Sequence, residues 1–143
     1  MSLQVKFQRR GLDLQVVSSK LEKTIIPGFI NAVADFAFTR MYQNSPWRTG
    51  FLAMSITKSV RKDGFSVKPT APYSIFVEKG TSPHIITPVN ASCLAFESGS
   101  GMVFTKMVFH PGTRANPFVA RTTVEVRESV DKIFDEAWKK EIT

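Results

Sequence analysis

The residues of this chain best suited to hold a metal ion are two histidines and one cysteine, His84, His110 and Cys93. They lie in three different loops of the predicted structure, whereas zinc sites usually include at least one pair of ligands only a few residues apart. Each histidine also stands beside a proline in a turn-like stretch. This spacing favours histidines that are exposed or that brace their loops, and we expect neither a metal nor a cofactor.

Three other candidates for chemistry have simpler explanations. Cys93 opens a predicted strand without a helix amino terminus that would stabilise a thiolate, so we expect a small buried hydrophobe and not a nucleophile. Glu78 and Glu97 could form a carboxylate pair of the glycosidase kind, but ordinary strands also carry glutamates. Gly80 is followed by Thr-Ser-Pro, which lacks the Gly-Lys-Ser/Thr of a phosphate-binding loop. We therefore expect no catalytic residues.

The glycine–threonine pairs of the chain predict turns. Glycine tolerates the positive φ that sharp turns require, and Thr49-Gly50 and Gly80-Thr81 are expected to orient strands. Near the last such pair, Asn116 can cap a helix and Pro117 suits its first turn. The predicted structural turns and caps, with an aromatic anchor at the end, are Thr49, Gly50, Gly80, Thr81, Gly112, Asn116, Pro117 and Phe118.

An arm and a helix are predicted before these turns. Residues 1–18 alternate loosely between apolar and polar types, which predicts an extended arm or edge strand. Residues 19–22 have capping-box spacing and predict the start of a helix. Pro27 should kink or restart this helix, and Ser45-Pro46 should end it.

Strands and a second helix fill the remaining chain. Alternation predicts a hairpin over residues 56–69, with Asp63-Gly64 supplying two positive-φ positions at its turn. Further strands are expected at 73–78, at 85–86, and in a hairpin formed by 94–96 and 102–109. From Pro117 to Lys140, apolar residues recur at helical spacing.

These elements predict the α+β class. We expect an amino-terminal arm and kinked helix, an antiparallel twisted sheet of about four to six strands, and a carboxy-terminal helix packed on the sheet. The length of 143 residues fits a single domain over residues 1–143.

The net charge and the hydropathy of the chain indicate which kinds of binding partner are possible. The net charge of +7 favours nucleic acid or an acidic protein surface, although the basic residues are scattered and form no cluster of five or more. No apolar run reaches the roughly 18 residues of a membrane span, and no charged-then-apolar leader is present. We expect synthesis in a cytoplasm and no membrane contact.

The later strands carry more apolar residues than one small sheet needs. Both alternating sets within residues 102–109 are apolar, so we expect cover on both faces, from the protein's own helix or from another subunit. A well-packed core is the alternative. The arm and the loop 88–101 are candidate contacts, and the candidate interface residues are Phe7, Phe104, Val108, His110 and Arg114.

Three segments together resemble the tail-completion, or head–tail joining (neck), family of long-tailed bacteriophages, typified by gene product ten of the HK-type lambdoid phages. Residues 46–55 match its Pro-x-x-Thr-Gly-x-Leu-x-x-Ser element, and residues 73–81 match Tyr-x-x-x-Val/Tyr-Glu-x-Gly-Thr. Residues 110–118 match His-Pro-Gly-Thr followed closely by Pro-Phe. The order and spacing extend over residues 20–138, while Trp47-Arg48 departs from the family's small or acidic residues.

The resemblance implies a non-catalytic structural protein of the virion, located at the head–tail junction and assembled in the host cytoplasm. The implied partners are copies of the chain in a ring, commonly a hexamer, with the head connector or stopper and the tail terminator or tail-tube proteins. Contact with DNA in the channel would be passive. A tail-terminator or minor tail protein is the nearest alternative, and a basic nucleic-acid-binding module is the alternative from another class.

Overall fold

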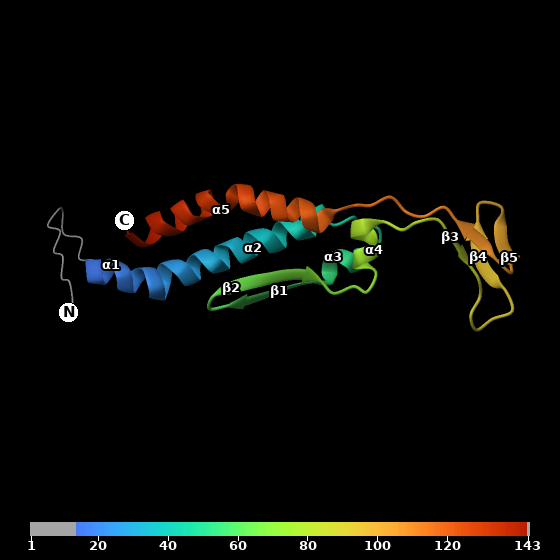
Figure 1. Ribbon diagram of the computed structural model, residues 1–143, viewed down its shortest axis with the longest axis horizontal. Helices are drawn as coiled ribbons and strands as arrows, with labels where there is room; N and C mark the ends of the chain where they lie inside the picture. Colours follow the sequence, from blue (N-terminus) through green and yellow to red (C-terminus); the bar gives the residue numbers. More distant parts are fainter. Residues whose placement is uncertain (1–13, 143) are drawn as a thin grey trace. The chain divides into compact units, whose positions relative to one another are not determined.

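A computed structural model of the protein describes residues 14–142, without the side chains of Leu14, Val16 and Val17. These residues divide into two compact units: the first runs to Ala71 and resumes at Phe118, and the second comprises Pro72–Pro117 (Figure 1). Residues 1–13 of the predicted arm, including Phe7, lie outside the described residues. The single domain over residues 1–143 stays a prediction.

The first unit begins with one long helical segment. It consists of α1 (Leu14–Lys20), a π-helical turn η1 (Leu21–Ile25) and α2 (Ile26–Asn44). The predicted extended conformation of residues 14–18 and the predicted helix start at residues 19–22 are therefore wrong. Helical hydrogen bonding of α1 outweighs the loose alternation, which covers too few residues to distinguish a strand from a helix.

Pro27 does not interrupt this helix, but it has a visible local effect. Proline cannot donate to the carbonyl group four residues earlier, and its ring crowds that group. Immediately before it, the Ile26 amide donates to the Leu21 carbonyl oxygen, five residues back, as in a π-helix. A π turn is one of the ways in which a helix accommodates such a defect.

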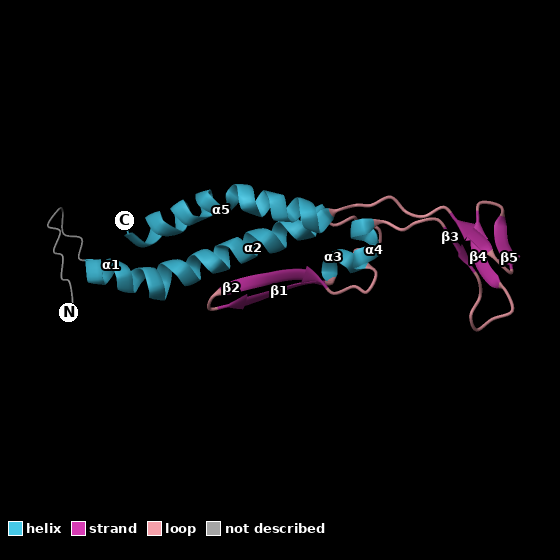
Figure 2. Cartoon of the chain, in the orientation of Figure 1, coloured by secondary structure: helices cyan, strands magenta, loops and turns pink. Residues whose placement is uncertain are grey.

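The helix α2 occupies the centre of the first unit. The helix α5 (Phe118–Ile142) packs along it, and so does the hairpin of β1 (Ile56–Arg61) and β2 (Gly64–Pro69) (Figure 2). Phe29 of α2 and Phe134 of α5 form an edge-to-face pair with ring centroids 5.3 Å apart. The buried apolar residues include Val33, Ala34, Ala37 and Met41 of α2 and Leu52 and Ala53 of α3 (Phe51–Met54).

The second unit contains one short helix and four short strands. They are α4 (Ser74–Lys79), β3 (His84–Ile86), β4 (Leu94–Ser98), β5 (Gly101–Thr105) and β6 (Val108–His110). The strand predicted at 73–78 is wrong, because α4 occupies this stretch. Its run Ile75-Phe76-Val77 is continuously apolar, and periodicity cannot separate such a short run into strand or helix.

The α+β class is confirmed, but the strands do not form one sheet. The described strands pair two by two, as β1–β2, β3–β6 and β4–β5, and all three pairs are antiparallel. A single sheet of four to six strands is therefore corrected to three separate pairs. The hairpin at 56–69 is confirmed, although its two turn residues are Lys62 and Asp63. Gly64 pairs with Arg61 and is not among the glycines with positive φ.

The described helices contain no segment that combines the length and the apolar character needed to cross a membrane.

Candidate functional site

The two Gly-Thr loops of the second unit meet at Thr81 and Thr113. The Thr81 amide donates to the Thr113 carbonyl oxygen at 3.0 Å, and the Thr113 amide donates to the Thr81 carbonyl oxygen at 3.1 Å. Their hydroxyl oxygens are 2.8 Å apart. Nearby, the Asn116 amide donates to the Val77 carbonyl oxygen at 2.9 Å. This hydrogen bond connects the segments near the beginning and the end of the second unit. We call the Thr81–Thr113 pair the threonine clip.

Both glycines beside the threonine clip are required by their backbone geometry. Gly80 has φ 73° and Gly112 has φ 86°. A Cβ atom on Gly80 would lie 2.5 Å from the Thr113 carbonyl oxygen, and one on Gly112 would lie 2.3 Å from the Thr81 carbonyl oxygen. The predicted turn role of both glycines is confirmed, and its cause is a close backbone approach as well as positive φ.

The turn at Thr49-Gly50 belongs to the first unit. Gly50 has φ 79° and precedes α3, so the turn leads into a short helix before β1 begins. A Cβ atom on Gly50 would lie 2.7 Å from the Trp47 ring. The Thr49 hydroxyl oxygen is 3.5 Å from the Phe51 amide. Gly50 is thus confirmed as a turn residue.

The predicted start of the last helix is displaced by one residue. The helix α5 begins at Phe118, so Pro117 lies immediately before it and not in its first turn. Phe118 is completely buried, as predicted. Cap positions commonly shift by one residue in this way, because the first turn of a helix has weakly defined hydrogen bonding.

The two histidines are direct partners in the register of β3 and β6. Their rings are stacked with centroids 5.0 Å apart. His84 Nδ1 lies 2.9 Å from the Ser82 carbonyl oxygen, so it must donate. His110 Nδ1 receives the Gly112 amide hydrogen at 3.0 Å, so it must accept. Each ring braces its own loop, as the sequence predicted, but the sequence did not reveal that the rings face each other.

The other candidates for chemistry lie apart from this pair. Cys93 is half-buried, so the expectation of a buried cysteine is wrong; it lies just before β4, in a unit without buried residues. Glu78 lies on α4 and Glu97 on β4. Within residues 14–142, no group of three or more histidine, cysteine, aspartate or glutamate residues could hold a metal ion.

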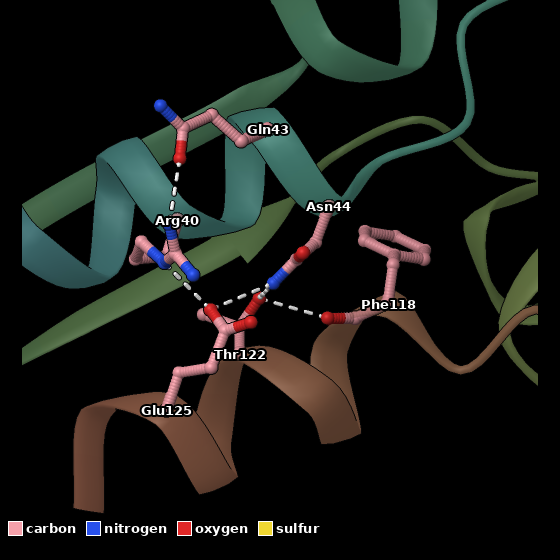
Figure 3. Close-up of polar contacts among 6 residues, drawn as sticks. All are labelled: Arg40, Gln43, Asn44, Phe118, Thr122 and Glu125. Atoms are coloured by element: carbon pink, nitrogen blue, oxygen red, sulfur yellow. Dashed lines mark hydrogen bonds and ion pairs between the residues drawn. The ribbon is translucent and has the colours of Figure 1, made fainter. Parts of the chain in front are cut away.

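A polar network joins α2 to α5 in the first unit (Figure 3). Arg40 Nε donates to Glu125 Oε2 at 2.7 Å, and Asn44 Nδ2 donates to the same oxygen at 3.0 Å. Asn44 Nδ2 also lies 3.1 Å from the Thr122 hydroxyl oxygen. The Thr122 hydroxyl, buried in the unit, donates to the Phe118 carbonyl oxygen at 2.8 Å. The network fixes the pairing of the two helices beside their buried anchor.

Glu125 is the residue of this network whose ionisation is perturbed. The hydrogen bond from Arg40 is the main cause that holds the pKa of Glu125 below its ordinary value. Desolvation opposes this effect, while the hydrogen bond from Asn44 and the positive charges of Arg40 and Arg121 strengthen it. The carboxylate therefore serves as an ionised structural contact between α2 and α5.

The second unit differs from the first in having no buried core. Every residue of 72–117 is described, and none of them is buried. Several of its large apolar side chains are more than half exposed, among them Phe76, Ile85, Met102, Phe104, Met107 and Phe109. Its charged residues are few, namely Glu78, Lys79, Glu97, Lys106 and Arg114. Apolar, aromatic and methionine-rich surface with few charges is typical of the centre of a protein–protein interface.

The strand register places four of these side chains in two groups. Ile85 and Phe109 are direct partners across β3–β6 and are 58% and 66% exposed. Met102 and Phe104 are two residues apart on β5, so they share one face, and are 59% and 66% exposed. We call Ile85, Met102, Phe104 and Phe109 the apolar set.

The predicted interface residues fall partly within this set. Phe104 belongs to it, Val108 and His110 are half-buried, and Arg114 is exposed. The sequence indicated the excess of apolar residues in 102–109 but missed Ile85 and the α4 residue Phe76. Alternation alone could have suggested Ile85, whereas the exposure of Phe76 depends on α4, which was expected to be a strand.

No family model, no curated protein and no solved structure matches this chain.

Proposed function

We propose that this chain is a non-catalytic structural subunit that associates with copies of itself through the apolar set of its second unit. The observation that carries the proposal is that the second unit has no buried residue and leaves Phe104 and Phe109 each 66% exposed. Neighbouring exposed apolar side chains mark interaction sites, and the apolar set contains two such pairs, Ile85 with Phe109 and Met102 with Phe104.

The short strands of the second unit support the same proposal. An isolated two-stranded hairpin is marginal in water unless a further strand or a helix packs on it. Both β3–β6 and β4–β5 are two-stranded and leave apolar side chains exposed. Contacts from a neighbouring subunit would supply the missing cover. The threonine clip would hold the base of the unit while these contacts form.

The resemblance of residues 46–55, 73–81 and 110–118 supports a location for this subunit. We propose a place at the head–tail junction of a long-tailed phage, in a ring commonly of six copies, between the head connector or stopper and the tail terminator or tail tube. In a closed ring each interface joins two different surfaces, so the apolar set would meet a different part of the neighbour.

The test is native mass spectrometry of the purified chain over a concentration series. A discrete closed oligomer is expected for the wild type, and monomers are expected for the Phe104→Ser/Phe109→Ser variant. Val124→Ser is the matched control, because Val124 lies on α5 of the first unit and is 52% exposed. It should leave the oligomer unchanged.

A wild type that stays monomeric at every concentration would contradict self-association by the chain alone. An oligomer that survives the double substitution would contradict the role of the apolar set. Negative-stain images of the oligomer would then distinguish a ring, which the proposed location requires, from a compact dimer.

A further inference from the structure

The β1–β2 hairpin has two faces of different character. Ile56 is buried, and Lys58 Nζ forms an ion pair with Asp35 of α2, so the residues of β1 that alternate with Thr57 face α2. Successive side chains of a strand point to opposite faces. Because α2 packs on the hairpin, the other face points away from α2.

The outward face carries hydroxyl and basic side chains and no acidic or apolar ones. By the strand register it consists of Thr57, Ser59 and Arg61 on β1 with Lys68, Ser66 and Gly64 on β2. All five side chains beyond the glycine are exposed. Lys62 follows Arg61 in the turn, beside the single acidic residue of the hairpin, Asp63. We call Thr57, Ser59, Arg61, Ser66 and Lys68, together with the adjacent turn residue Lys62, the outer hairpin face.

The basic residues of this face are not neutralised by the protein. Within the described residues, Arg61, Lys62 and Lys68 take part in no ion pair. The lysines of α5 differ in their sequence neighbours, because Lys132, Lys139 and Lys140 lie within a stretch that also contains Asp131, Asp135, Glu136 and Glu141. Arg61, Lys62 and Lys68 thus form a small group of exposed basic residues on the hairpin, with Asp63 as the one acidic residue of the hairpin.

We propose that the outer hairpin face binds the phosphate backbone of duplex DNA, without reading its sequence. Arginine, lysine, serine and threonine side chains supply most protein contacts to phosphate oxygens. The inner face of the hairpin is occupied by α2, so the ribbon lies on the backbone and does not enter a groove. Three charged donors predict about three neutralised phosphates.

An acidic protein surface is the competing partner. A surface that binds another protein usually also contains aromatic or apolar residues near its centre, even where it contacts carboxylates. The outer hairpin face contains none, and hydroxyl groups occupy the positions between its charges. This composition favours a uniform polyanion. The inference does not rest on the proposed function, because the apolar set lies in the other unit.

The test measures binding of the full chain to a fluorescently labelled duplex DNA by anisotropy over a range of salt concentrations. Each phosphate contact contributes about 0.9 to the slope of log affinity against log salt. The Arg61→Gln/Lys62→Gln/Lys68→Gln variant should lose roughly 2.7 of the wild-type slope. The Lys132→Gln/Lys139→Gln/Lys140→Gln variant removes the same net charge from α5 and should keep most of that slope.

Three results would overturn the proposal. The first is a wild-type protein that does not bind the duplex at low salt, and the second is an equal loss of slope in both variants. The third is displacement of the duplex by polyglutamate at equal charge concentration, which would favour an acidic protein partner.

Native mass spectrometry and circular dichroism of both variants serve as controls. Unchanged oligomers and helix content ensure that a selective loss of slope reports on the outer hairpin face. Unchanged oligomers also separate this test from that of self-association.

Discussion

His84 and His110 stack on each other across β3–β6 while their Nδ1 atoms play opposite roles, one as donor and one as acceptor. The consequence differs for the two rings. His84 Nδ1 carries the hydrogen that it donates to the Ser82 carbonyl oxygen. His110 Nδ1 offers its lone pair to the Gly112 amide. The loop that leads to the threonine clip therefore contains a hydrogen bond whose acceptor is the His110 ring.

The first prediction concerns the hydrogen bond from Gly112 to His110. Replacing His110 with leucine removes the acceptor, and a typical hydrogen bond contributes about 0.5–1.5 kcal/mol net. We expect the Gly112 amide to exchange with solvent roughly two- to tenfold faster. Hydrogen exchange followed by NMR measures this rate. His84→Leu is the control, because it removes the stacked ring but not the acceptor, and equal acceleration in both variants would contradict the prediction.

The second prediction concerns the glycines of the threonine clip. Gly80→Ala places a Cβ atom 2.5 Å from a backbone oxygen at a positive φ, and strain of this kind costs about 1–3 kcal/mol. We expect the Thr81 and Thr113 amides to lose most of their protection from exchange. Gly99→Ala is the matched control, since no atom lies within 4 Å of its added Cβ. Preserved protection in Gly80→Ala would show that the clip tolerates a side chain there.

Local signals in the sequence predicted much of the fold. Glycine and proline positions gave the turns at Gly50, Gly80 and Gly112, and helical periodicity gave α2 and α5. Alternation predicted β1, β2 and the β4–β5 hairpin. These features depend on neighbours within a few residues, which the sequence displays directly. The single strand predicted over residues 102–109 is wrong, because this stretch forms β5 and β6, and β6 pairs with β3.

The features of the fold that were predicted wrongly or not at all depend on contacts between residues far apart in the sequence. The pairing of β3 with β6 joins stretches more than twenty residues apart, and nothing in either short strand specifies its partner. The division of the strands into three pairs has the same origin. Short apolar runs such as Ile75–Val77 fit a helix or a strand equally well. For this reason the sequence could predict neither the helical conformation of α4 nor the exposure of Phe76. The Arg40–Glu125 contact likewise joins two helices that lie at opposite ends of the chain.

The third prediction concerns the anchor of α5. Phe118 is fully buried, and truncation of a buried phenylalanine typically costs about 3–5 kcal/mol. We expect Phe118→Ala to lower the midpoint of urea unfolding strongly. Val124→Ala on the same helix should have little effect, because Val124 is largely exposed. A midpoint that changes equally in both variants would contradict a specific anchoring role.

The last prediction concerns the pH dependence of the α2–α5 pairing. Arg40 and Asn44 hold the pKa of Glu125 below its ordinary value in the folded protein, so the unfolded chain binds the Glu125 proton more readily. The resulting stabilisation is present above the ordinary carboxyl pKa and is lost as the pH falls through it toward the folded-state pKa. Glu125→Gln should therefore be less stable than the wild type at neutral pH, and the difference should shrink on acidification. Urea unfolding of both proteins at a series of pH values measures this difference.

Glu128→Gln is the control, because Glu128 is exposed on the same helix, and it should show no comparable pH-dependent difference. A stability difference for Glu125→Gln that stays constant from neutral to acidic pH would show that the ionised carboxylate does not stabilise the helix pair.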